Sequence, residues 1–235
     1  VSLRSATDPS ADLRVVSSRE GGTVTLTATN VRSMVLDGHA LRAAGVTAVV
    51  VDGRRMEVPD ADLPIGPQEG KRPGTHGPFN EALQQPFCFV YPDAGPAVWR
   101  EYAAYLVSSW AVTGNGYGCA LPLSAVDATV RDGHVLVYLG LGADVVRPTV
   151  DARWSDAALT LGGASHPDAA MVVVFPERPD RLGAAIVTTA GSERLLYRFM
   201  PFSSQFAAPD AMVFSAQGVR AAGFFDGVWM NFRAL

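Results

Sequence analysis

The segment from residue 59 to residue 78 most constrains how this chain can fold. It holds five prolines and four glycines within twenty residues. Proline fixes φ and removes a backbone donor, and glycine weakens helices and strands alike, so no long regular element can run through this segment. Connections of this length are uncommon inside a compact domain and usually serve as a linker or a functional loop. The sequence therefore predicts a β-rich module over residues 1–60, a connection over residues 61–85 and an α/β domain over residues 86–235.

The first part has the pattern of short strands. Residues 23–29 alternate between apolar and polar side chains, and an Asp52-Gly53 pair marks a hairpin turn. The other expected strands are four short runs: residues 13–17, 32–36, 46–51 and 54–58. We expect a small β-sandwich-like module of four to six strands.

The second part begins with a β-α-β pattern. Residues 87–91 form a continuous apolar run, as in a strand covered on both faces. An amphipathic helix is expected from residue 97 to about residue 112, ended by Gly114, because large apolar residues recur at three- and four-residue spacing. A short helix is expected between residues 120 and 131, and the remaining expected strands are residues 134–139, 169–175 and 183–189, the last two as an antiparallel hairpin. The fold class predicted is mixed α/β: a layered α/β domain with a mixed sheet follows the β-sandwich-like module.

Composition excludes several classes of partner. The net charge of −4 and the isoelectric point near 5.5 argue against a nucleic-acid surface, and no apolar run approaches the length needed to cross a bilayer. Cys88 and Cys119 are the only cysteines, and we interpret them as two buried thiols, with a single disulfide as the alternative. The chain starts at Val1 without an initiator methionine, a basic region or an apolar region. We therefore expect it to be part of a longer protein and any signal segment to lie upstream or to have been removed.

Motifs for nucleophilic, metal and nucleotide chemistry are incomplete. The stretch Gly163-Ala164-Ser165-His166-Pro167 lacks the last glycine of a nucleophile elbow. The four histidines stand at least 32 residues apart, which supports no metal site. Two glycine-rich stretches, residues 114–118 and 140–145, do not fit a phosphate-binding turn. No cofactor is therefore expected.

Carboxylates near the first strand and helix are the remaining candidates for acid–base chemistry. Glu81, Asp93 and Glu101 flank these elements, and we interpret Asp93 as a helix-capping residue and Glu101 as part of a solvated helix face. The loop over residues 70–83 adds His76, but it enters the amino end of its strand, whereas ligands of open α/β sheets collect at the carboxyl ends.

Several stretches of the chain resemble a known family. They are Lys71 to Ala82, Pro86 to Tyr91, Trp99-Arg100, Leu136 to Gly140 and Ala222 to Trp229. Together they look like the region that follows the catalytic domain in large secreted bacterial proteins of prolyl-oligopeptidase-like or α/β-hydrolase-like type. In that family a motif close to Lys-x-x-Gly-Leu-x-Gly-Pro-Ile-Asp-Asp-Ala-Phe precedes the strand, and an Ala-Gly-Phe-Phe-Asp-x-x-Trp segment lies near the C-terminus. This chain departs from it at Asn80-Glu81-Ala82-Leu83 and at Gly140 to Asp144, where the family has Gly-Asp-Pro-x-x-Asn.

The resemblance implies that the catalytic serine, histidine and acid lie upstream of this chain. The leading expectation is a non-catalytic C-terminal accessory region, secreted or in the cell envelope, that packs on the upstream hydrolase domain or on another copy of the chain. One alternative is a stand-alone hydrolase with a site assembled from loops around His76, Glu81 and Asp144. A second is a carbohydrate-binding module that holds polysaccharide on exposed Trp154 or Trp229.

Overall fold

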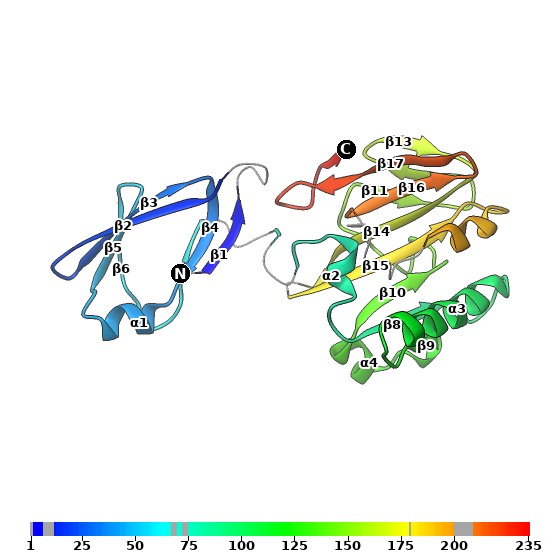
Figure 1. The fold of residues 1–235 in the computed structure, drawn as a ribbon, viewed down its shortest axis with the longest axis horizontal. Coiled ribbons are helices and arrows are strands. Elements are labelled where there is room, and N and C mark those ends of the chain that lie inside the picture. Colours follow the sequence, from blue (N-terminus) through cyan, green and yellow to red (C-terminus); the bar gives the residue numbers. More distant parts are fainter. Residues whose placement is uncertain (1, 7–11, 67–69, 72–74, 179, 200–208) are drawn as a thin grey trace. The chain divides into compact units, whose positions relative to one another are not determined.

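Two compact units make up the chain. The computed structural model describes residues 2–6, 12–66, 70–71, 75–178, 180–199 and 209–235 (Figure 1). The units are Val1–Pro73 and Gly74–Leu235, and each has its own hydrophobic core. The division falls within the segment rich in proline and glycine.

The first unit consists of two sheets and one short helix. A three-stranded antiparallel sheet has the order β1-β4-β7, and a four-stranded sheet has the order β2-β3-β5-β6, in which only β3 and β5 are parallel. The elements are β1 (Ser2–Ala6), β2 (Arg14–Glu20), β3 (Thr23–Thr29), β4 (Val31–Leu36), α1 (Gly38–Ala43), β5 (Ala48–Val51), β6 (Arg54–Glu57) and β7 (Leu63–Ile65). Buried side chains from both sheets, such as Leu26, Met34 and Val49, form one cluster.

Local sequence explains two features of this unit. Asp52 and Gly53 both have positive φ, as the tight turn between β5 and β6 requires. The Asp37 carboxylate accepts a hydrogen bond from Ala40 N at 2.9 Å and so caps α1, a helix that the sequence analysis did not predict.

The second unit is built on an eight-stranded sheet of order β18-β17-β16-β14-β15-β10-β8-β9. Its strands are β8 (Phe87–Tyr91), β9 (Cys119–Pro122), β10 (Val135–Leu139), β14 (Ala169–Arg178), β15 (Arg181–Thr188), β16 (Ala211–Ser215), β17 (Gly218–Phe225) and β18 (Phe232–Ala234). Strands β9, β8, β10 and β15 are parallel to one another, and the pairs from β15 to β18 are antiparallel. The mixed sheet of the prediction is confirmed.

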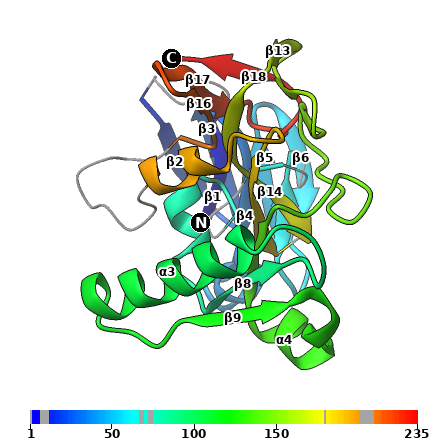
Figure 2. The same cartoon turned by 90° about the vertical axis from the view of Figure 1, so that its right-hand side faces the viewer.

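Helices and a small second sheet accompany this sheet. The helices are α2 (Phe79–Ala82), α3 (Val98–Thr113) and α4 (Ala128–Gly133), with short 3-10 turns η1 (Leu123–Ala125) and η2 (Glu193–Arg198). The second sheet has the order β11-β12-β13 and consists of β11 (Ala152–Trp154), β12 (Leu159–Leu161) and β13 (Ala164–His166). Helix α3 packs on β8 and β9 (Figure 2), and its buried residues are Trp99, Tyr102, Ala103 and Leu106.

Two expectations are corrected by this architecture. The second unit is mostly β rather than a layered α/β domain, because three antiparallel strands, β16 to β18, extend the sheet and a further sheet replaces helices. Cys88 and Cys119 are not free thiols: they form a disulfide between the neighbouring strands β8 and β9, with their Cα atoms 4.5 Å apart. The parallel register, which pairs Cys88 with Cys119, brings the two side chains together.

Candidate functional site

The parallel half of the sheet defines one position where a ligand site is expected. The strand order in this half is β9-β8-β10-β15. The chain runs from β8 to its neighbour β9 on one side and then crosses to β10, the neighbour of β8 on the other side. In such sheets the connections on either side of the first strand diverge, which leaves a crevice at the carboxyl ends of the first and third strands. Here that crevice lies between the ends of β8 and β10.

The protein's own side chains close this crevice. Gly140, directly after β10, has a φ of 62°, and a Cβ added to it would lie 2.1 Å from Cε2 of Trp99. The indole of Trp99, which is 6% exposed, therefore packs directly on the backbone at Gly140. The close approach of an aromatic ring explains why glycine stands at this position.

The polar groups at the same edge are used within the fold. Asp93 follows β8, and its carboxylate accepts hydrogen bonds from the backbone N–H of Ser124 at 3.1 and 3.2 Å and from the Ser124 hydroxyl. Asp93 therefore joins the end of β8 to the turn after β9, and α3 begins without a side-chain cap, contrary to the capping role that we predicted. Trp154 Nε1 donates to the carbonyl oxygen of Leu141 at 2.9 Å, beside Gly140.

His76 and Glu81, two of the predicted site residues, form a pair. The backbone N–H of His76 donates to Glu81 Oε2 at 2.8 Å, and His76 Nδ1 lies 2.7 Å from Glu81 Oε1. Because the carboxylate holds the proton on Nδ1, the neutral imidazole keeps Nε2 as its proton acceptor. The ring is 58% exposed, whereas the carboxylate is 8% exposed. A buried acid that orients an accessible histidine is the arrangement that general-base catalysis requires.

A nucleophile does not complete this pair within the described part of the chain. Glu81 is the hydrogen-bonding partner of His76 there, and no serine, threonine or cysteine side chain is hydrogen-bonded to the imidazole. Asp144 is not joined to this pair: it follows the carboxyl end of β10, whereas α2, which holds Glu81, adjoins β14 and β15. The structure thus joins two of the three predicted residues and does not join the third.

The two tryptophans predicted to bind sugars lie in the core. Trp154 is 9% exposed and Trp229 is 2% exposed, so neither ring offers an accessible face to a ligand. Trp229 lies beside Phe225, with ring centroids 6.0 Å apart. The expectation that these rings are exposed is wrong, because the sequence pattern around them does not distinguish a core aromatic residue from a surface one.

Two of the segments that carry the family resemblance meet at Asp210. A Cβ on Gly77 would lie 2.0 Å from Asp210 Oδ1, and Asp210 Oδ2 accepts the backbone N–H of Phe225 at 2.8 Å. Asp210 is fully buried, and Phe79 N donates to the carbonyl oxygen of Pro209 at 3.3 Å. These residues therefore build an internal junction between the 75–82 loop and β17.

A further titratable pair, missed by the sequence analysis, lies on β10 and β14. The Tyr138 hydroxyl donates a hydrogen bond to Glu177 Oε1. Gly183, on the intervening strand β15, leaves room for the Glu177 side chain, because a Cβ on Gly183 would lie 3.1 Å from Glu177 Cβ. Burial raises the pKa of Glu177, an effect opposed by the hydrogen bond from Tyr138 and by nearby arginines. Burial, followed by the contact with Glu177, also raises the pKa of Tyr138.

The arginines around this pair bind structural groups. Arg181 Nη1 donates to the carbonyl oxygens of Arg131 at 2.9 Å and His134 at 3.3 Å, at the C-terminal end of α4, and Arg178 pairs with Asp132 at 2.8 Å. Cations are favourable at the C-terminus of a helix because its carbonyl groups point outward there. The cluster therefore fastens α4 to the β14–β15 hairpin.

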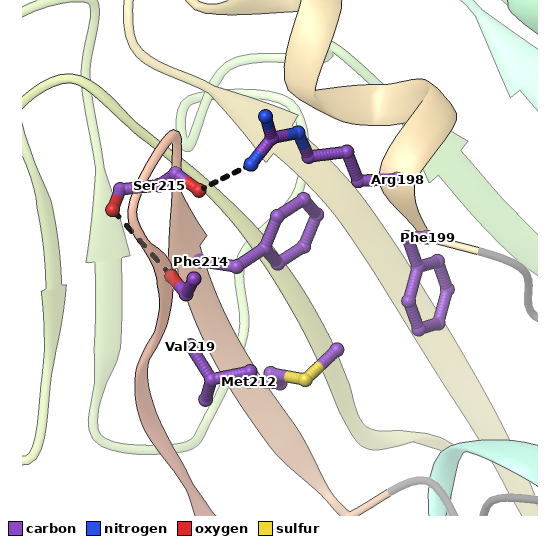
Figure 3. Close-up of a pocket in the computed structure, with 7 residues that line it drawn as sticks. Arg198, Phe199, Met212, Phe214, Ser215 and Val219 are labelled. Atoms are coloured by element: carbon purple, nitrogen blue, oxygen red, sulfur yellow. Dashed lines mark hydrogen bonds between the residues drawn. The ribbon is translucent and has the colours of Figure 1, made fainter.

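A small hollow of about 180 Å³ lies between η2 and the β16–β17 hairpin (Figure 3). Its lining is mainly apolar and includes Phe199, Met212, Phe214 and Val219. The guanidinium of Arg198 is hydrogen-bonded to the carbonyl oxygens of Ser215 at 3.3 Å and Ala216 at 2.7 Å. Since its one charged side chain has these backbone partners, this hollow does not have the polar groups of a reaction centre.

The chain matches no protein-family model, and no curated protein matches it either. Among the residues that the structure describes, no three histidine, cysteine, aspartate or glutamate side chains cluster as metal ligands would. In the same residues, none of the helices combines the length and the apolar character that a bilayer crossing demands.

Proposed function

We propose that this chain is a non-catalytic accessory region of a secreted bacterial serine hydrolase, which packs on or orients the catalytic domain. The observation that carries the proposal is the closure of the crevice between β8 and β10 by Trp99 and Gly140. A sheet of this topology would hold its ligand there. A site filled by the protein's own side chain favours a structural role over catalysis.

Two further features support the proposal. The residues of the resemblance around Gly77 and Phe225 hold the fold together at the buried Asp210. The Cys88–Cys119 disulfide favours an oxidising compartment, since disulfides are rare in cytosolic proteins.

Exposed apolar side chains suggest where the hydrolase domain would contact this chain. Val219, Phe224, Met230 and Leu235 are exposed and lie on or near β17 and β18. We expect these side chains to become buried when the hydrolase domain packs on this part of the sheet.

The test is to purify the product from its native source, measure its intact mass and treat it with a fluorophosphonate probe. We expect a mass well above 24.8 kDa and a labelled serine outside the 235 residues of this chain. A product of 24.8 kDa with a labelled serine inside the chain would refute the accessory role.

A second function, a stand-alone hydrolase, is favoured by the His76–Glu81 pair alone. Its test is phosphonate labelling of the chain by itself, with the variant His76→Gln. A matched control is His39→Gln, because His39 makes a similar contact, 2.8 Å from Nδ1 to Asp60 Oδ1, in the first unit. Labelling that is lost in His76→Gln and kept in His39→Gln would establish the hydrolase; absence of labelling in the unaltered chain would exclude it.

A further inference from the structure

A groove of about 730 Å³ opens at the amino ends of the parallel strands in the second unit. Phe87 begins β8, Cys119 begins β9, and His134 directly precedes β10. The polar and aromatic residues that line the groove are Gln84, Gln85, Phe87, Trp110, Tyr117 and His134. Its volume is in the range of small-ligand sites, which span about 300 to 1,000 Å³.

A glycine-rich loop places an exposed aromatic ring, that of Tyr117, at this groove. A Cβ on Gly114 or on Gly116 would lie 2.5 Å from atoms of the Trp110 ring, and a Cβ on Gly118 would lie 3.0 Å from the Val107 side chain. The loop can therefore follow α3 this closely only because these positions carry no side chain. Tyr117, within the same loop, is fully exposed.

The groove has hydrogen-bonding groups and no formal charge. None of its lining residues is Asp, Glu, Lys or Arg. Gln84 and Gln85 bring amides, which both donate and accept. His134 Nδ1 lies 3.3 Å from the carbonyl oxygen of Val130, which can only accept, so the neutral ring has its proton on Nδ1 and keeps Nε2 as an acceptor. These groups match an uncharged ligand with many hydroxyl groups.

We infer that this groove binds a neutral oligosaccharide, with the Tyr117 ring stacked on the C–H face of a sugar. A pyranose has an apolar face and a rim of hydroxyl groups, so it fits an aromatic ring flanked by amides. A phosphorylated or carboxylated ligand would require a positive charge that the lining does not supply. This site is distinct from the buried Trp154 and Trp229, and it does not depend on the accessory role proposed above.

The Cys88–Cys119 disulfide makes the floor of the groove rigid. Cys119 lines the groove and is bonded to Cys88, whose side chain is fully buried on β8. A site held on fixed strands loses little conformational freedom when a ligand binds.

Affinity electrophoresis of the full chain tests the inference. The gels contain laminarin, hydroxyethylcellulose, galactomannan or, as the anionic comparison, alginate. We expect one of the neutral polysaccharides to retard the chain, Tyr117→Ala to bind at least about tenfold more weakly, and Tyr117→Phe to keep most of the binding. Because the Tyr117 side chain is fully exposed, its replacement leaves the fold intact.

Val112→Ala is the control. Val112 is an exposed apolar residue on α3 that does not line the groove, so its loss should not alter retardation. Three results would overturn the inference: no retardation by any neutral polysaccharide, equal retardation of Tyr117→Ala and the unaltered chain, or retardation by alginate alone.

Discussion

Reduction of the Cys88–Cys119 disulfide should destabilise the second unit by a predictable amount. The two cysteines are 31 positions apart, and the loop that they close loses conformational entropy in the unfolded chain. For a loop of this length the chain-entropy relation gives about 3.7 kcal/mol at 25 °C. With a urea dependence of about 3 kcal/mol per molar for a unit of this size, the unfolding midpoint should fall by about 1.2 M.

Tryptophan fluorescence isolates this unit from the other one. All four tryptophans lie beyond residue 74, so the signal reports the unfolding of the second unit alone. The assay is a pair of urea titrations with and without a phosphine reductant. The double variant Cys88→Ala, Cys119→Ala is the control, because its midpoint should be the same in both.

A small shift would refute the reasoning. If the oxidised and reduced chains unfold within about 0.2 M urea of each other, the disulfide constrains a region that is already ordered in the unfolded ensemble. The same result would follow if the cysteines of the purified protein were reduced, and a count of free thiols in denaturant separates the two explanations.

Two further substitutions test the packing and the electrostatics of the second unit. The variant Gly140→Ala should destabilise the second unit by about 2 to 4 kcal/mol, because φ is positive at this position and the new Cβ would overlap Trp99. Position 133 has open space around it, so the control variant Gly133→Ala should be neutral or slightly stabilising. Thermal unfolding of the two variants measures the difference. The variant Glu177→Gln should gain stability relative to the unaltered chain as the pH rises from about 4 to about 7. Because burial raises the pKa of Glu177 in the folded state, the stabilisation that Glu177 gives is complete below its unfolded pKa and is lost as the pH rises through its folded pKa. Glutamine accepts the hydrogen bond from the Tyr138 hydroxyl and does not titrate. Urea titrations at the two pH values measure this difference, and a constant difference would show that Glu177 does not titrate differently on folding.

The elements predicted best from the sequence are those with a long apolar run or a clear apolar periodicity. Strands β3 and β8 have the expected bounds, and α3 differs from its expected bounds by one residue at each end, because their apolar runs or periodicity are long and clear. Strand β9 was missed, since its four residues are only half-buried and include Pro122. Short strands of this kind depend on a neighbour that the sequence does not specify.

The site was predictable only where the residues are close in the chain. His76 and Glu81 are five positions apart, so a loop that enters a short helix can bring them together. The contact of Trp99 with Gly140 joins residues 41 positions apart, and only the relative placement of β8 and β10 reveals it. The same holds for Tyr138 and Glu177, which meet across the intervening strand β15.

The division of the main sheet into an antiparallel and a parallel half has a consequence for the order of folding. In the antiparallel half, Val174 pairs with Ala184, ten positions along the chain, whereas in the parallel half Phe87 pairs with Val135, 48 positions away. Contacts between distant residues form more slowly because longer loops must close first. We expect the β14–β15 hairpin to form first and the β8–β9 pair next, because Cys88 and Cys119 are 31 positions apart. The β8–β10 and β10–β15 pairs, which join more distant residues, should form last. Cys88 and Cys119 can then meet before the sheet is complete, so oxidation of the pair would fix β8 beside β9 ahead of the final strand pairing.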